Sequence, residues 1–229
     1  MLNNESVNMQ PLDQTQISCE SIPHASVLLY SGSLFFKCIQ HCNLVPNPLK
    51  ITHSGIVIHI SGFELMSFLT TGQFVNVKPQ AIQRIRDAIY YEDDIVRPYT
   101  IEACFPYVLI APVDKIVAKY EGSVYIRRPI FQHQIIWKDL IGLPFKLNLK
   151  QMLLTGWELN KHEDSRSLFC SELVSLIINR SGAIKVISTN ILPKLLVSTS
   201  KEKDILQGVF QKECLLNLIF LKLKSSGSD

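Results

Sequence analysis

The sequence predicts an α+β fold in which a mostly antiparallel sheet packs against a few helices. Two observations indicate this class: several short apolar segments have the composition of strands, and other segments repeat their apolar residues at helical spacing. The composition agrees, since 47% of the 229 residues are hydrophobic and 19% are charged. That balance excludes a globally disordered or collagen-like chain.

The predicted strands are short runs rich in Val, Ile, Leu and Tyr, each bounded by Gly, Pro or charged residues. They cover residues 27–30, 33–36, 55–60, 100–104, 107–110 and 123–126. Together they predict the mostly antiparallel sheet.

Three segments are predicted as helices. The first opens at Lys78-Pro79 and repeats Ile82, Ile85 and Ile89 on one face. The second covers residues 170–179 and ends at Ser181-Gly182. The third runs from about residue 204 to 223 and is apolar on many sides, so we expect the rest of the protein to cover it.

The chain is expected to form one folded domain. Residues 1–26 are rich in Asn, Gln, Ser and Glu without an apolar period, which is typical of a flexible N-terminal arm. The domain is placed at residues 27–224, with an inserted segment at about 61–99 that forms either a lid or a decoration of the fold. Residues 225–229 are expected to be a flexible tail.

Charge and hydropathy exclude several partners. The net charge of +3 is too small for a dedicated nucleic-acid-binding protein, so no nucleic acid is expected. No apolar run reaches the roughly 18 residues of a spanning helix, so we expect no transmembrane segment, although peripheral membrane contact stays open.

The N-terminal segment also predicts the compartment. The first basic residue is Lys37, so we expect no secretory signal, and the six cysteines are interpreted as reduced thiols of a cytoplasmic protein. If the chain is viral, this is the cytoplasm of the host cell. If it is a bacterial effector, it is the cytoplasm of the cell to which it is delivered.

Cys170 lies at the predicted start of a helix, in Phe169-Cys170-Ser171-Glu172. The unpaired N–H groups and positive dipole end of a helix N-terminus favour a thiolate, which is the form that acts as a nucleophile. The alternative is a buried structural cysteine, since free Cys is among the most buried residue types. This segment alone leaves both readings open.

A thiolate catalyst also needs a base and a group that orients it. His53 is the candidate base because it stands at the head of a strong strand, although His59 would share a face with it in a straight strand. Glu102 is the candidate orienting group, as a lone carboxylate in the apolar stretch 99–104. For Glu102 the sequence itself favours exposure to solvent.

Other motifs give weaker evidence about function. Cys38, His41 and Cys42 have a spacing that could gather a metal on one helical face, but no second ligand pair follows at finger spacing. We therefore expect no metal, and without a P-loop or dinucleotide motif no other cofactor. Arg127-Arg128 could meet an anionic substrate group, although paired arginines are more typical of a solvated or ion-paired surface.

The order of several motifs resembles that of one family. The motifs are Ser31-Gly32-Ser33, Thr52-His53-Ser54-Gly55, Ile101-Glu102-Ala103, Tyr125 to Pro129, Gly142-Leu143-Pro144-Phe145 and Phe169 to Val174. In this order they resemble the circularly permuted branch of the NlpC-type papain-like cysteine hydrolases, the YiiX-like proteins. Relatives of that branch occur in large DNA viruses and among the lecithin-retinol-acyltransferase-like enzymes. The resemblance covers most of residues 27–200.

The resemblance implies a permuted papain-like fold, with Cys170 as nucleophile, His53 as general base and acid, and Glu102 orienting His53. The implied activity is cleavage of an amide or ester bond in a small-molecule, lipid or peptide substrate through an acyl-enzyme. Ser54, Gly55 and Phe145 are then expected at the substrate-binding site.

Two residues depart from the family pattern: Ser33 stands where the family has Asp, and Phe145 where it has Tyr, so no hydroxyl at 145 can bind an oxyanion. One alternative is therefore a catalytically weak or inactive papain-like binding module. A lipid acyltransferase that uses the same thioester is another.

Overall fold

The structure is a computed structural model. It describes residues 16–17, 19–32, 49, 51–72, 74, 77–89, 91–130, 134–145, 170–183, 196 and 206–218. The predicted strand at 33–36, most of the predicted arm, the tail at 225–229 and the motif of Cys38, His41 and Cys42 lie outside these residues.

The described residues form a mixed α+β structure around a six-stranded antiparallel sheet with the order β5-β4-β3-β2-β6-β7. Its strands are β2 (Val27–Ser31), β3 (Ile51–Ser61), β4 (Val96–Cys104), β5 (Tyr107–Pro112), β6 (Ser123–Arg127) and β7 (Cys214–Leu215). The five predicted strands within the described residues are confirmed, and β3 and β4 begin four residues earlier than predicted. A separate parallel pair joins β1 (Gln16–Ile17) to β8 (Asn217–Leu218).

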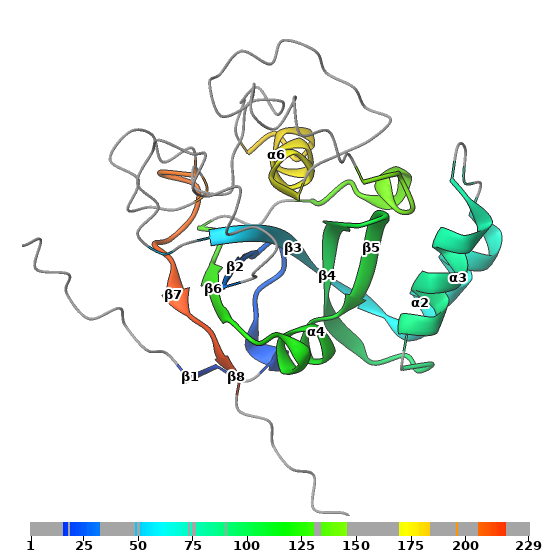
Figure 1. Cartoon of the computed structure of the whole chain (residues 1–229), viewed down its shortest axis with the longest axis horizontal. Coiled ribbons are helices and arrows are strands. Elements are labelled where there is room, and N and C mark those ends of the chain that lie inside the picture. The colour runs from blue at the N-terminus through cyan, green and yellow to red at the C-terminus, as the bar shows by residue number, and fades with distance from the viewer. Residues whose placement is uncertain are drawn as a thin grey trace, which may run out of the picture.

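Helices lie on both faces of the sheet. The helices are α2 (Gly62–Thr71), α3 (Pro79–Ala88), α4 (Val113–Lys119) and α6 (Cys170–Arg180), with short 3₁₀ turns η1 (Cys19–Ser21) and η2 (Lys138–Leu140). Helix α6 covers one face and α4 lies against the other, while α2 and α3 sit beside the β4–β5 edge (Figure 1). In the described part of the chain, no helix has the length and apolarity needed to cross a bilayer.

The core has one apolar cluster on each face of the sheet. In β2, Val27 and Leu29 belong to the cluster under α6, and Leu28 and Tyr30 to the cluster under α4. This alternation follows from the two-residue period of a strand. Because both faces are covered, the strands read as continuous apolar runs in the sequence.

The predicted insertion forms the connection between β3 and β4 and contains α2 and α3. Helix α3 begins at Pro79 and buries Ile85, as its periodicity predicts, and it packs against β5. Helix α2 was not predicted. Its N-terminus is capped by Ser61, whose hydroxyl accepts a hydrogen bond from the Glu64 amide, a capping-box spacing.

The prediction of a helix at about 204–223 is wrong over the described residues. Residues 206–210 form a turn, followed by β7 and β8. Gly208 takes a φ of +79°, in the left-handed region that interrupts a helix. Cys214 and Leu215 pair with Ile126 and Tyr125 of β6, so hydrogen bonding at the open sheet edge replaces helical packing.

The described end of the predicted N-terminal arm is part of the domain. Ile22 is fully buried in the cluster under α4. The amide of Ala25 donates to the carbonyl of Val57, and the Val57 amide donates to the carbonyl of Ser26. These bonds attach residues 22–26 to β3, which polarity along the sequence did not indicate.

Arg127 is buried, in contrast to the solvated surface typical of paired arginines. Its Nε donates to the Gln211 carbonyl and its Nη1 to the Leu196 carbonyl, both at 2.9 Å. The side chain is 1% exposed. Arg127 thus joins β6 to two segments that are distant in the sequence.

Replacing this side chain is the first prediction. Arg127→Met should lower the free energy of unfolding by about 3 kcal/mol, because it removes two charge-assisted hydrogen bonds, one of them to the carbonyl of the buried Leu196. Chemical denaturation measures the change. The matched control is Arg128→Met at the partly exposed neighbour, with an expected change within about 0.5 kcal/mol. Equal effects of the two substitutions would contradict this account.

Candidate active site

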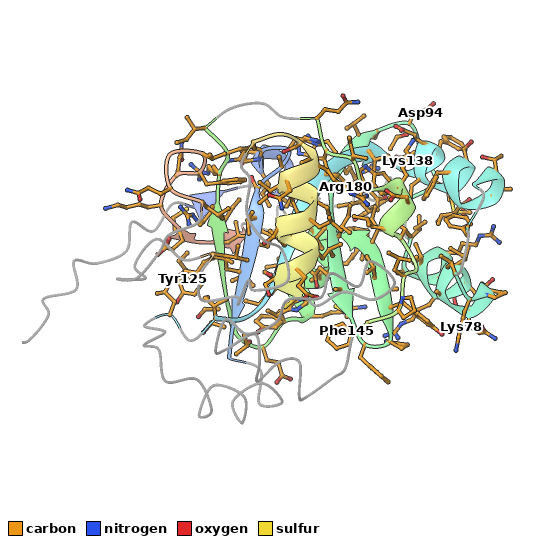
Figure 2. All side chains as sticks on the ribbon, turned by 90° about the horizontal axis from the view of Figure 1, so that it is seen from above. Lys78, Asp94, Tyr125, Lys138, Phe145 and Arg180 are labelled. Atoms are coloured by element: carbon orange, nitrogen blue, oxygen red, sulfur yellow. The ribbon has the colours of Figure 1, made fainter. Side chains whose placement is uncertain are left out.

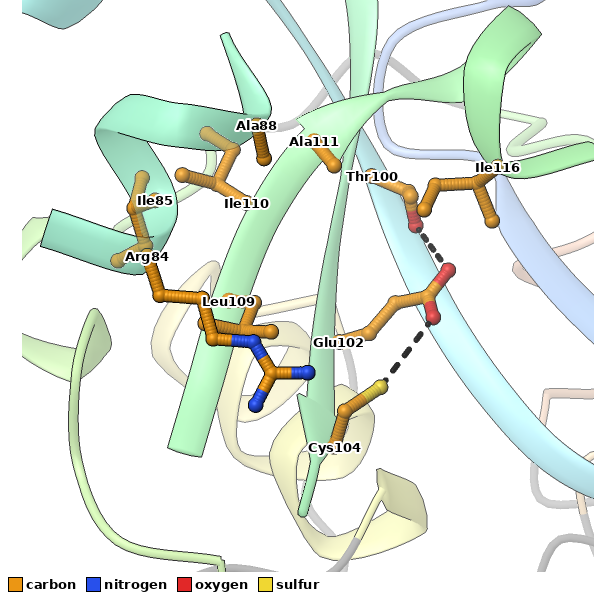
Figure 3. A pocket seen from close by; sticks show the side chains of 10 residues that line it. All are labelled: Arg84, Ile85, Ala88, Thr100, Glu102, Cys104, Leu109, Ile110, Ala111 and Ile116. Carbon is orange, nitrogen blue, oxygen red and sulfur yellow. Dashed lines mark hydrogen bonds between the residues drawn. The ribbon is translucent and has the colours of Figure 1, made fainter. Parts of the chain in front are cut away.

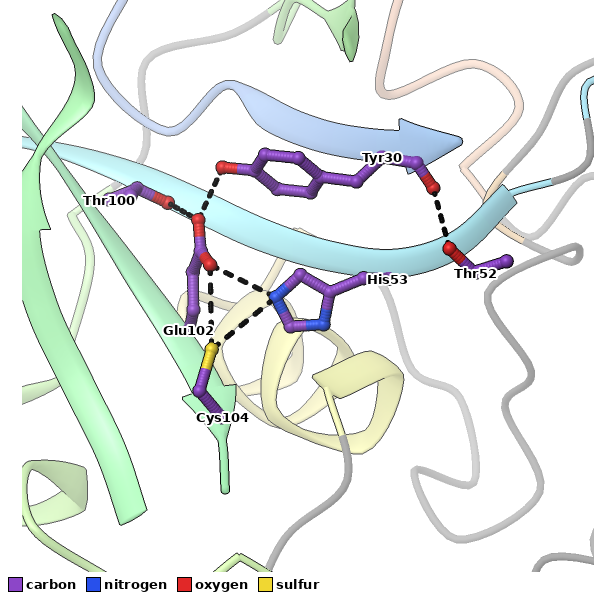
Figure 4. Close-up of polar contacts among 6 residues, drawn as sticks. All are labelled: Tyr30, Thr52, His53, Thr100, Glu102 and Cys104. Carbon is purple, nitrogen blue, oxygen red and sulfur yellow. Dashed lines mark hydrogen bonds and ion pairs between the residues drawn. The ribbon is translucent and has the colours of Figure 1, made fainter. Parts of the chain in front are cut away.

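His53 and Glu102 come together on neighbouring strands, where β3 begins and β4 ends. Gly55 of β3 pairs with Glu102 of β4, so His53 and Glu102 share one face of the sheet. The distance from His53 Nε2 to Glu102 Oε2 is 3.0 Å (Figure 4). The two residues that the resemblance implied as base and orienting group therefore contact each other.

Glu102 is buried, although its sequence context favoured exposure to solvent. The residue is only 7% exposed. Tyr30 Oη donates to Oε1, and Thr100 Oγ1 donates to the same oxygen at 3.1 Å. Burial by itself would raise the pKa of Glu102. The hydrogen bond and positive charge of His53, together with hydrogen bonds from Tyr30 and Thr100, hold the pKa below its usual value. The carboxylate is therefore ionised.

Tyr30 was not identified from the sequence as a site residue. Its side chain is almost fully buried, and its ring centroid lies 5.2 Å from that of His53. Burial and the neighbouring Glu102 charge raise its pKa well above 10.0, so the phenol stays protonated and donates to the carboxylate. In the sequence Tyr30 is only one apolar residue of a buried strand, which gives no signal of this role.

Gly55 provides the space in which Glu102 lies. A Cβ at Gly55 would be 2.6 Å from Thr100 Oγ1 and 2.7 Å from Glu102 Cγ, both closer than packing allows. The sequence placed Gly55 at the substrate-binding site. In the structure, Gly55 instead packs directly against the side chain of Glu102, the residue that contacts His53.

Cys170 is the first described residue of α6 and is 6% exposed. Burial by itself raises the pKa of its thiol. The charge of His53, a hydrogen bond with its ring and donors of Ser54 outweigh burial and lower the pKa below the usual value. Cys170 therefore interacts with His53 and Ser54 across the fold and tends toward the thiolate.

Ser54 points to the opposite side of β3 from His53. It is fully buried, and its Oγ makes no hydrogen bond to an oxygen or nitrogen among the described residues. Ser54 is one of the groups that lower the pKa of Cys170.

His53 is influenced by two cysteines as well as by Glu102. Burial lowers the pKa of His53, but the charges of Cys104 and Cys170 and hydrogen bonds to both raise it well above 6.5. Nε2 is the ring nitrogen that contacts Glu102.

Cys104, the last residue of β4, is a second thiol at the site that was not identified from the sequence. Its Sγ lies 3.7 Å from His53 Nε2 and 3.6 Å from Glu102 Oε2. Burial raises its pKa, and the nearby His53 only partly offsets this. His53, Glu102 and Cys104 are also the residues that could hold a metal ion, since their ligand atoms lie within 4.8 Å of one another.

A cavity of about 200 Å³ opens beside Glu102 and Cys104 (Figure 3). Its wall is mostly apolar and combines β4 and β5 with α3 and α4. The lining residues are Arg84, Ile85, Ala88, Thr100, Glu102, Cys104, Leu109, Ile110, Ala111 and Ile116. The inserted helix α3 thus helps to form a cavity that reaches the site.

Phe145 packs against the apolar cluster that includes Cys170, and His59 has a partner of its own. Phe145 is partly buried, and its amide donates to the carbonyl of Pro106 in the turn that follows Cys104. In Figure 2, Phe145 and Arg180 lie toward opposite ends of α6. His59 Nε2 contacts the Ile22 carbonyl at 2.7 Å, so the competing histidine has a structural partner.

Comparisons of this chain with protein-family models, curated proteins and solved structures found no match.

The space at Gly55 gives the second prediction. Gly55→Ala should displace Thr100 and Glu102, cost about 1–3 kcal/mol of unfolding free energy and loosen the His53–Glu102 contact. We expect slower alkylation of Cys170 by iodoacetamide, measured by peptide mass spectrometry.

The control is Gly182→Ala. An added Cβ there meets nothing within 4 Å, but the φ of +76° makes alanine strained, so this variant loses stability without touching the site. Alkylation at the unaltered rate in Gly55→Ala would contradict the role given to Gly55.

Proposed function

We propose that this chain is a thiol hydrolase with a permuted papain-like arrangement, which cleaves an amide or ester bond through an acyl-enzyme on Cys170. The main support is the position of His53, which contacts Glu102 through Nε2 and also interacts with Cys170. A cysteine of lowered pKa beside an imidazole that a carboxylate orients is the arrangement that nucleophilic catalysis requires.

The two thiols near His53 differ in the property that matters for a nucleophile. The pKa of Cys170 is lowered, while burial raises that of Cys104. Cys170 is also the first described residue of α6, and in this proposal it lies at the helix N-terminus, where backbone amides favour a thiolate. These differences support Cys170 as the nucleophile.

In the proposed reaction, His53 Nδ1 takes the proton of the Cys170 thiol while Nε2–H stays bonded to Glu102. The thiolate attacks the carbonyl carbon to give a tetrahedral oxyanion. Collapse of this intermediate breaks the C–N or C–O bond, and His53 gives its proton to the leaving amine or alcohol. Water then attacks the thioester with His53 as base, which releases the acid and restores the thiol.

The oxyanion needs donors, and Phe145 provides no hydroxyl. The backbone N–H of Cys170 at the start of α6 is one candidate donor. Ser54 is a second, because its hydroxyl is buried beside the Cys170 sulfur without an oxygen or nitrogen partner among the described residues. One such donor is typically worth a hundredfold to a thousandfold in rate.

The substrate class in this proposal is a small-molecule, lipid or peptide amide or ester. The mechanism uses only protein side chains and calls for no cofactor. Because the proposed reaction needs Cys170 as a free thiol, a reducing compartment such as the cytoplasm is part of this proposal.

Alkylation tests the nucleophile, and this is the third prediction. Iodoacetamide near neutral pH should label Cys170 before Cys104, and His53→Ala should slow labelling of Cys170 at least about tenfold by removing the imidazolium beside the sulfur. The matched control is His59→Ala on the same face of β3, which should leave the labelling rate unchanged. An unchanged rate of Cys170 labelling in His53→Ala would contradict the proposed interaction between Cys170 and His53.

Turnover gives the fourth prediction. With p-nitrophenyl esters of short and medium acyl chains, Cys170→Ala should lower kcat/KM by about a thousandfold or more. An acyl adduct should appear on Cys170 by mass spectrometry. Release of the free acid supports hydrolysis, whereas transfer to an added lysophospholipid supports an acyltransferase. Unchanged turnover in Cys170→Ala, or reactive esters that leave no adduct, would refute catalysis and favour a binding module.

A further inference from the structure

Cys104 takes no part in the proposed reaction, yet it completes a compact group of metal-binding atoms. Its sulfur, His53 Nε2 and Glu102 Oε2 form a triangle with sides of 3.7 Å, 3.6 Å and 3.0 Å (Figure 4). The first side joins sulfur to nitrogen, the second sulfur to oxygen and the third nitrogen to oxygen. The three donors come from two adjacent strands, whose pairing fixes their spacing.

This triangle has the size of one face of a zinc tetrahedron. With Zn–S of about 2.3 Å and Zn–N and Zn–O of about 2.0–2.1 Å, tetrahedral angles put sulfur about 3.6 Å from the nitrogen and from the oxygen. They put the nitrogen about 3.3 Å from the oxygen. Only the last edge differs noticeably from the structure, and its two atoms now share a hydrogen bond.

The surroundings also suit a zinc ion. A thiolate, an imidazole and a carboxylate are the ligands that zinc prefers, whereas calcium and magnesium select oxygen alone. Tyr30 and Thr100 donate to Oε1 of Glu102, which leaves Oε2 for the metal and fixes the carboxylate. The adjoining cavity of about 200 Å³ has room for water as a fourth ligand and gives a route of entry.

We propose that Cys104, His53 and Glu102 bind a zinc ion, and that the bound ion blocks the chemistry of Cys170. The second part rests on the proposed function. Binding releases the thiol proton of Cys104 to solvent, and the metal replaces the Nε2 proton of His53 and its bond to Glu102. The ring loses the proton at Nε2 and takes one up at Nδ1, so it stays neutral and only its tautomer changes. The neutral ring then carries its proton on Nδ1, so His53 has no lone pair there to accept the proton of Cys170.

Cobalt binding tests the site independently of catalysis. The chain used carries Cys38→Ser and Cys42→Ser, which removes the other Cys-His-Cys motif. One equivalent of Co²⁺, with a phosphine reductant, should produce a thiolate-to-cobalt charge-transfer band in the near ultraviolet. Adding Cys170→Ala should keep the band, and adding Cys104→Ala should abolish it. Cys214→Ala serves as the cysteine control and should keep it.

Absence of the band, its loss in Cys170→Ala or its persistence in Cys104→Ala would overturn the site. Cys104→Ser, checked by circular dichroism, replaces Cys104→Ala if the latter fails to fold, since a serine hydroxyl gives no thiolate band.

Alkylation tests the inhibition. In the same Cys38→Ser, Cys42→Ser chain, one equivalent of Zn²⁺ should slow iodoacetamide labelling of Cys170 at least about tenfold, and a chelator should restore it. Within Cys104→Ala, the rates with and without Zn²⁺ should be equal. A cobalt band without any effect of Zn²⁺ on labelling would overturn the inhibitory role. If the proposed function itself fails, Cys170 labels slowly with or without Zn²⁺, while the cobalt band remains.

Discussion

The buried charge of Glu102 is the constraint on which the site depends. An unpaired carboxylate in such a place would cost several kcal/mol, so the charge persists only because donors surround it. Tyr30 comes from β2, His53 from β3 and Thr100 from β4. The register of three neighbouring strands is therefore tied to one side chain, and Gly55 leaves the space that this side chain occupies.

The same carboxylate contacts one nitrogen of the His53 ring. Nε2 lies near both Glu102 and Cys104. The two thiols that influence His53 differ in pKa: His53 and Ser54 lower the pKa of Cys170, whereas burial prevails at Cys104 and raises its pKa. In the functions proposed here, one half of the ring moves protons and the other either orients the ring or accepts a metal.

The insertion between β3 and β4 contributes to the cavity beside the site, and its described residues make none of the hydrogen bonds to Glu102 or His53. Ser61 starts α2 through its capping bond, and Ile85 fixes α3 against the core. Placed at the β5 edge, α3 brings Arg84 and Ala88 to the cavity that also touches Glu102 and Cys104. A segment that the sequence left open as either a lid or a decoration of the fold therefore helps to shape the space beside the site.

The sequence by itself determined five strands of the main sheet and two of the helices, because apolar periodicity is a local signal. The pairing of His53 with Glu102 was implied by the family resemblance, while the sequence context of Glu102 favoured exposure to solvent. It missed Tyr30 and Cys104, and it wrongly predicted a helix over residues that form β7 and β8. Pairing across strands and burial on both faces of a sheet are non-local properties. Only the tertiary structure could decide that Glu102 is buried, that Gly55 serves it, and that Cys104 and Cys170 share one histidine.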